Sequence, residues 1–186
     1  MTDRGTGLGL ILAGVASIVA VVLLAVFFAV GGVFGHLNDA MNGVFAFLAG
    51  EAAWSMRRRI GQNAAILAMV GAVVGIVGSA LVITETTGFI LAGFVTSVGF
   101  GLIGPAVLAA AASYARDGIA TGRLALLGRA TGRLFLVSLL AAIPAAMRLD
   151  DMDTVPAWAW APMVGWIGVY LTYPVWAITL GRRLRG

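Results

Sequence analysis

The sequence predicts an all-α fold, a polytopic transmembrane bundle of six helices with the N-terminus and the C-terminus cytoplasmic. Three observations lead to it. The chain of 186 residues is 61% apolar and only 11% charged, whereas a soluble domain carries about a quarter charged residues. Apolar runs of about 20 residues recur along the chain, each long enough to cross roughly 30 Å of hydrocarbon. The charges gather at the ends of these runs. Residues 1–186 are therefore expected to form a single transmembrane domain.

Six apolar segments are expected to cross the membrane, joined by short connections. The first is longer than the roughly 7–15 apolar residues of a secretory signal, so we interpret it as a retained helix. The fifth is the weakest, because its purely apolar part, residues 134–147, spans only about 21 Å at helical rise. This helix must therefore begin near residue 128. The expected spans are residues 8–34, 38–56, 63–84, 88–114, 128–148 and 157–180.

The second of these segments, residues 38–56, decides the number of crossings. If it crosses, eleven of the twelve arginines lie on the cytoplasmic side and only Arg148 lies outside. If it lies flat on the surface, the chain crosses five times, and arginines 57–59 move to the side opposite the C-terminal arginines. Short cytoplasmic loops of membrane proteins carry an excess of basic residues. The charge pattern therefore favours six crossings.

Small residues and prolines indicate where the helices pack and bend. Gly71, Gly75 and Gly78 fall on one face of the third helix, so that a neighbouring helix can approach closely. The motif Ile-Leu-Ala-Gly begins at residues 11 and 90, in helices of opposite direction, which fits either an inverted repeat or a chance match. Three prolines lie inside the last three spans and are expected to bend them: Pro105, Pro144 and Pro174.

Two polar residues share one face at the outer end of the second helix. Asp39 and Asn42 are three residues apart, a spacing that places both side chains on the same side. They form either a site at which an ion or a proton enters, or a helix start in which Asn38 or Asp39 caps free amides. His36 is interpreted as an interfacial residue.

Glu51 and Arg133 are expected at comparable depth on the cytoplasmic side. Glu51 lies six residues before Arg57, so it is about 9 Å deep at helical rise. Isolated charges inside a membrane are costly, and pairing removes much of that cost. One prediction is an ion pair between Glu51 and Arg133. The alternative is that Arg133 extends to the interface and Glu51 meets Arg58 or headgroup water.

The residue inventory argues against an enzyme. The chain has no cysteine and one histidine, so thiolate chemistry and a histidine-based metal or haem site are not expected. It contains no lysine for a Schiff base and no phosphate-binding loop. No catalytic residue, cofactor or metal ligand is predicted. Nucleic acid is not an expected partner, because the arginines lie at the ends of apolar runs.

Two sequence stretches carry a family resemblance. They are Leu37-Asn38-Asp39 at the start of the second helix and Tyr173-Pro174-Val175-Trp176-Ala177-Ile178, followed by Gly181-Arg182-Arg183-Leu184. With them the chain resembles small bacterial six-helix membrane proteins of unknown function. The resemblance implies a multi-pass protein of the cell inner membrane, that is, the cytoplasmic (plasma) membrane. It implies no known activity.

Two classes of function are predicted. In the first, a non-enzymatic integral membrane protein acts through helix-packing contacts with a partner protein, a second copy of itself or lipid, with anionic lipid at the cytoplasmic arginines. In the second, the chain is a small-solute or ion transporter that uses the kinked fourth to sixth helices. A transporter should gather polar groups near the middle of the bilayer. The strongest polar positions in the sequence are expected toward the ends of the helices, which favours the first class.

Overall fold

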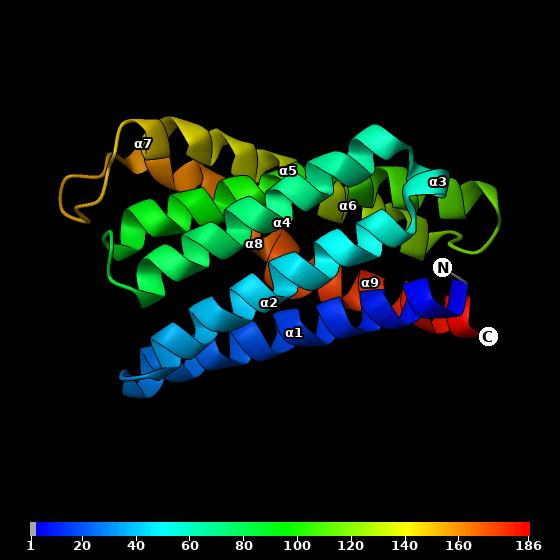
Figure 1. Cartoon of the computed structure of the whole chain (residues 1–186), viewed down its shortest axis with the longest axis horizontal. Helices are drawn as coiled ribbons and strands as arrows, with labels where there is room; N and C mark the ends of the chain where they lie inside the picture. The colour runs from blue at the N-terminus through cyan, green and yellow to red at the C-terminus, as the bar shows by residue number, and fades with distance from the viewer. Residues whose placement is uncertain (1–2) are drawn as a thin grey trace.

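The computed structural model describes residues 3–186, and these residues form helices and no strands. Figure 1 shows the long helices running roughly parallel or antiparallel in one elongated bundle. In chain order, the α-helices are α1 (Asp3–Val30), α2 (Phe34–Ser55), α3 (Arg57–Ile60), α4 (Gln62–Ile83), α5 (Phe89–Arg116), α6 (Arg123–Val137), α7 (Ala142–Ala146), α8 (Gly165–Ile167) and α9 (Tyr173–Arg185). Between them lie the 3₁₀ turns η1 (Ser138–Ala141) and η2 (Ala157–Val164) and the π-turn η3 (Gly168–Thr172).

Five helical segments are long and apolar enough to cross a membrane: Asp3–Val30, Gln62–Ile83, Phe89–Arg116, Arg123–Ala146 and Ala157–Arg185. These five candidate spans correspond to five of the six expected segments. The helix α2 is as long as α4, at 22 residues each, but it is not among the five. Its polar residues, including Asn38, Asp39 and Glu51, lower its hydropathy. A sixth crossing therefore stays a prediction.

The first helix ends earlier than its apolar run suggested. The run was expected to continue through residue 34, but α1 ends at Val30. Gly31 and Gly32 then take φ values of +70° and +69°, a left-handed conformation that glycine adopts at little cost. The chain reverses at this point and α2 begins at Phe34.

The long helices form a closed ring in which each contacts two principal neighbours. Around the ring, α5 packs against α4, α4 against α2, α2 against α1, and α1 against α9, while α6 closes the ring between α5 and η3. Gly71 and Gly78 of α4 lie against α5, and Gly75 lies against Ala46 of α2. A Cβ atom at Gly71 would lie 2.5 Å from the carbonyl oxygen of Gly99, so these glycines permit the close crossing of the helices.

Opposite charges mark the two ends of the bundle. Both termini lie at one end, together with α3 and the turn between α5 and α6 (Figure 1). We call this the arginine end, because these segments hold Arg4, Arg57, Arg58, Arg59, Arg116, Arg182, Arg183 and Arg185. The turns at residues 31–33, 84–88 and 148–156 lie at the other end, which we call the acidic end for Glu85, Asp150, Asp151 and Asp153. There the Asp150 carboxylate accepts hydrogen bonds from the backbone N–H groups of Gly88 (2.6 Å) and Leu91 (3.0 Å) and so holds the start of α5.

The last crossing segment changes its hydrogen-bonding pattern along its length. It passes from η2 through α8 and η3 into α9. Pro174, in the first turn of α9, has no N–H to offer the carbonyl of Tyr170, four residues earlier. Pro144 similarly lies in α7, directly after η1, and Pro105 lies inside α5. Single π-turns inside helices occur frequently at functional sites.

Candidate functional site

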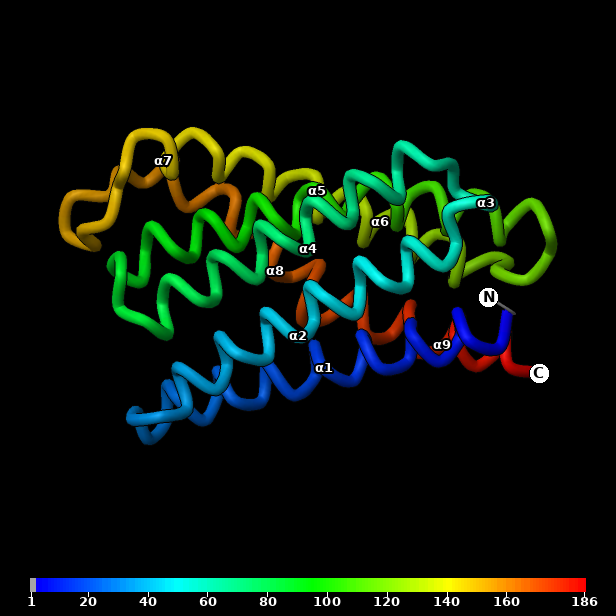
Figure 2. The backbone as a smooth tube through the Cα atoms, in the orientation of Figure 1, coloured from blue at the N-terminus to red at the C-terminus, as the bar shows by residue number. Residues whose placement is uncertain are grey.

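A cavity opens at the acidic end of the bundle. It consists of two overlapping volumes of about 260 Å³ and 780 Å³, and we call it the acidic-end cavity. Figure 2 shows the α1–α2 hairpin diverging from α4 and α5 toward this end. Six residues line both volumes: Leu24, Phe28, Asn38, Asp39, Phe89 and Trp160. Deeper in, Phe94, Trp166 and Tyr170 add aromatic surface, so the walls are mainly apolar, as in most small-molecule sites.

A buried hydrogen-bond network forms the floor of this cavity. The Asn38 amide donates to the carbonyl oxygen of Ala20 (2.7 Å) and to the Tyr170 hydroxyl (3.3 Å). The Tyr170 hydroxyl donates to the Asn42 amide oxygen (3.1 Å), and the Asn42 amide donates to the Asn38 oxygen (3.3 Å). Nearby, the Ser17 hydroxyl donates to the carbonyl oxygen of Val169 (2.5 Å). The network therefore joins α1, α2 and η3.

Asp39 is the buried acidic residue of the cavity wall, and the exposed Glu85 lies at its mouth. It is 8% exposed, and it lines both volumes. Among residues 3–186, its carboxylate has no hydrogen bond and no ion pair. The capping alternative is wrong, because α2 begins at Phe34 with Val33 in the cap position. Asn42 is also buried, but it joins the network and not the Asp39 carboxylate.

An aromatic cluster closes the cavity at the middle of the bundle. Phe45, Phe100, Phe135 and Tyr173 come from α2, α5, α6 and α9 and are at most 2% exposed. The Phe45 ring lies 5.3 Å from Phe100 and 5.1 Å from Tyr173, edge to face in both cases. Phe135 stacks on Tyr173 at 5.7 Å. Both geometries are favourable for aromatic pairs.

Directly behind this cluster, in the interior of the bundle, free space is small. A void of about 10 Å³ lies among Leu10, Ala53, Tyr173 and Trp176. The aromatic cluster therefore separates the acidic-end cavity from the other side of the bundle.

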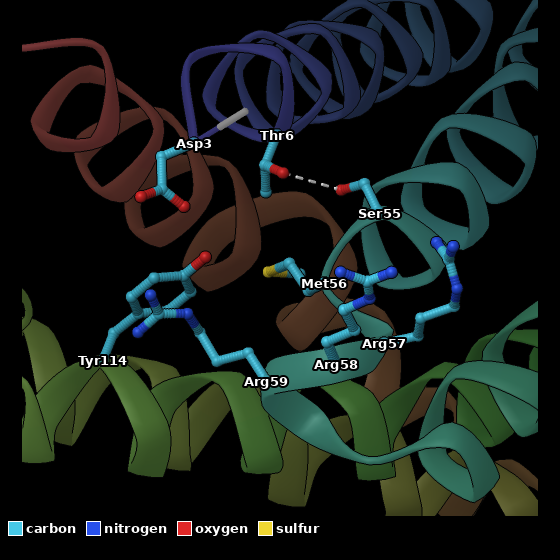
Figure 3. A pocket seen from close by; sticks show the side chains of 8 residues that line it. All are labelled: Asp3, Thr6, Ser55, Met56, Arg57, Arg58, Arg59 and Tyr114. Atoms are coloured by element: carbon cyan, nitrogen blue, oxygen red, sulfur yellow. Dashed lines mark hydrogen bonds between the residues drawn. The ribbon is translucent and has the colours of Figure 1, made fainter. Parts of the chain in front are cut away.

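A second pocket, of about 220 Å³, lies at the arginine end (Figure 3). The Ser55 hydroxyl donates to Thr6 (3.0 Å) and joins α2 to α1 at its rim. Arg59 lies over the Tyr114 ring, 4.6 Å from its centroid, and forms an ion pair with Asp117. The pocket is lined by Asp3, Thr6, Ser55, Met56, Arg57, Arg58, Arg59 and Tyr114.

The structure does not bring Glu51 and Arg133 together. Both side chains are exposed, and among residues 3–186 the ion pair that forms is Arg59–Asp117. Glu51 does not meet Arg58 in an ion pair either. The helix α2 packs against α1 and α4, whereas α6 packs against α5. Helical rise gave their depth along the bundle but not the direction in which each side chain points.

Several residues of the site did not emerge from the sequence. Tyr170 and Ser17 carry no pattern that separates them from ordinary membrane-helix hydroxyls, and their partners are distant in the chain. Trp160 lines both volumes of the cavity, and no motif in the sequence marks it for that position. Within residues 3–186, no group of three or more His, Cys, Asp or Glu side chains could hold a metal ion.

Comparison of the chain with protein-family models, curated proteins and solved structures gave no match. Residues 3–186 form a helical protein with five candidate membrane-spanning helices, and no family is identified for the chain. The resemblance to small bacterial six-helix membrane proteins stays a prediction.

Proposed function

We propose that the chain crosses the cytoplasmic membrane six times, with both termini inside, and carries a small solute across it. The crossing count draws on α2, which matches α4 in length and packs between α1 and α4. A crossing α2 leaves the segments of the arginine end on one side of the membrane. That distribution agrees with the preference of cytoplasmic loops for basic residues.

The observation that carries the transport proposal is the position of the buried network. The acidic-end cavity ends on Asn38 and Tyr170, and both hydrogen-bond to the buried Asn42 behind them. Ser17 lies near the middle of Asp3–Val30, and Tyr170 near the middle of Ala157–Arg185. In a membrane centred on these two segments, the contact of Tyr170 with Asn38 and Asn42 would lie near mid-membrane, although Asn38 is close to the start of α2. Secondary transporters bind their substrates at this depth, on interrupted helices.

The interrupted last segment supports the same proposal. The π-turn η3 carries Tyr170 and lies between α8 and α9. Thr172 in this turn accepts a hydrogen bond from Thr131 of α6 (2.8 Å). Short stretches of altered helical geometry absorb the backbone changes of moving segments. A carrier would open the arginine side by separating the aromatic cluster and closing the acidic-end cavity.

The other class of function, action through helix-packing contacts, has no comparable observation. Large apolar side chains are exposed along α4, among them Val70, Val73 and Val77, but a crossing helix exposes such residues to lipid alone. We retain one part of that prediction, an attraction of anionic lipid to the arginine end. We also propose that the protein is non-enzymatic, because its transport role needs no catalytic group.

Single-cysteine accessibility tests the transport proposal without background, since the chain has no cysteine. Gly93→Cys introduces a thiol into the acidic-end cavity, where a Cβ atom meets nothing within 4 Å. Ala53→Cys places one beyond the aromatic cluster. In sealed vesicles of each orientation, an impermeant thiol reagent should modify Gly93→Cys from the acidic side and Ala53→Cys from the arginine side. Conditions that increase the modification of Gly93→Cys should decrease the modification of Ala53→Cys, and the reverse should also hold.

Two surface variants provide the controls. Asp153→Cys should react only from the acidic side and Arg58→Cys only from the arginine side, which also measures the orientation of the vesicles. Reaction of both controls from the same side would refute six crossings. If Gly93→Cys reacts and Ala53→Cys stays unreactive from both sides under all conditions, the cavity has one opening and the carrier proposal is refuted.

A further inference from the structure

We propose that the occupant of the acidic-end cavity is an organic cation with an apolar body, and that Asp39 is its counter-ion. This inference rests on the proposed function, because it takes this cavity as the solute-binding site. It goes further by naming the class of solute and the residue that selects it.

The isolation of the Asp39 carboxylate is the first argument. A carboxylate in a largely buried position is costly unless a cation or several hydrogen-bond donors approach it. Within residues 3–186, no ion pair or hydrogen bond reaches this group. Arg148 belongs to a turn at the same end of the bundle, but neither Arg148 nor any other arginine lines either volume. His36, one turn before Asp39, lies at the exposed mouth.

The aromatic walls are the second argument. The ring centroids of Phe94 and Trp160 lie 6.4 Å apart, and those of Trp166 and Tyr170 lie 5.2 Å apart. Two aromatic pairs therefore line the space in front of the floor. The faces of aromatic rings attract cations, most strongly where water is excluded. Rings also pack against the apolar body of a solute.

The third argument is that three hydrogen-bond donors of the floor and wall already donate to oxygen atoms of the protein. The Asn38 amide and the Tyr170 hydroxyl already donate to protein oxygens. The Trp166 indole N–H donates to the Ser97 hydroxyl (2.9 Å). These groups of the floor and wall thus present oxygen atoms and ring faces to the cavity. An anion would be repelled by the Asp39 carboxylate, and a neutral apolar solute would leave that carboxylate unpaired.

Two ions of the same shape and opposite charge provide the test. The protein is placed in lipid nanodiscs, and tetraphenylphosphonium or tetraphenylborate is equilibrated across a dialysis membrane. Empty nanodiscs measure the partitioning of each ion into lipid. The wild-type protein should bind tetraphenylphosphonium beyond that background, and tetraphenylborate should show no excess. Asp39→Asn should weaken binding at least about tenfold, which is about 1.4 kcal/mol.

The matched control is Asp153→Asn, which removes an acidic group from the exposed loop at the same end. It should change the affinity by less than about twofold, because exposed charges contribute little. Equal binding of tetraphenylphosphonium by the wild type and by a folded Asp39→Asn variant would overturn the inference. Equal binding of the two ions by the wild type would also overturn it.

A second measurement leaves Asp39 in place, in case Asp39→Asn does not fold. Tetraphenylphosphonium should protect Gly93→Cys from the thiol reagent, and tetraphenylborate should not. The outcomes also separate this inference from the transport proposal. Binding that depends on Asp39, with Ala53→Cys unreactive from both sides, supports the cation site and refutes the carrier. Reciprocal labelling of the two cysteines without tetraphenylphosphonium binding supports the carrier and refutes the cation site.

Discussion

Tyr170→Phe should destabilise the protein, whereas Tyr173→Phe should not. The Tyr170 hydroxyl accepts a hydrogen bond from Asn38 and donates one to Asn42, at 3.3 Å and 3.1 Å. Hydrogen bonds between membrane helices contribute about 0.6 kcal/mol on average and at most about 1.7 kcal/mol each. Loss of both therefore predicts about 1–3 kcal/mol, because Asn38 and Asn42 also lose a buried partner.

Tyr173 provides a closely matched control. It is 2% exposed, and among residues 3–186 its hydroxyl makes no hydrogen bond, although its ring lies in the aromatic cluster. Tyr173→Phe keeps the ring and should change the free energy of unfolding by less than about 0.5 kcal/mol.

Reversible unfolding in mixed micelles of rising dodecyl sulfate content measures both changes. Thermal unfolding in a mild detergent gives an independent ranking of the variants. Equal stability of Tyr170→Phe and the wild type, or a larger loss in Tyr173→Phe, would show that the network does not hold η3 against α2.

Two further predictions concern helix packing. Gly99→Ala should destabilise the protein by about 1–3 kcal/mol, because its Cβ atom would lie 2.7 Å from the Gly71 carbonyl oxygen, whereas Gly93→Ala meets nothing within 4 Å and should be neutral; equal melting temperatures for the two would contradict the close α4–α5 crossing. Glu51→Ala and Arg133→Ala should have additive effects on the free energy of unfolding, within about 0.5 kcal/mol, because the structure forms no ion pair between these residues. A coupling energy above about 1 kcal/mol in the double-mutant cycle would restore the ion pair predicted from the sequence.

The sequence predicted those features that depend on local composition. Apolar run length located five candidate membrane-spanning segments within residues 3–186, since hydrocarbon thickness fixes the number of helical residues that cross it. Segment ends were less accurate. The reversal after Val30 depends on Gly31 and Gly32, but glycine in an apolar run also serves helix packing, as at Gly71. The residue type alone does not distinguish these two uses.

The candidate site could not be predicted in the same way, because it depends on the order of the helices around the ring. Tyr170 and Asn42 are 128 residues apart in the chain, and only the packing of η3 beside α1 and α2 brings them together. The predicted ion pair between Glu51 and Arg133 does not form in the structure, for the same reason. Their depth followed from helical rise, but their directions depend on which neighbours each helix contacts.

The network at η3 links the stability of the bundle to the occupancy of the cavity. Asn38 bonds to both Ala20 and Tyr170, so it holds the interrupted segment against α1 and α2 while lining the cavity. Asp39 is the next residue on α2, and any displacement of that turn by a bound cation moves Asn38 as well. A ligand shifts a conformational equilibrium only through different interactions with the two states. In the proposed site, Asp39 would supply the interaction with the cation, and the adjacent Asn38–Tyr170 hydrogen bond would transmit it to η3.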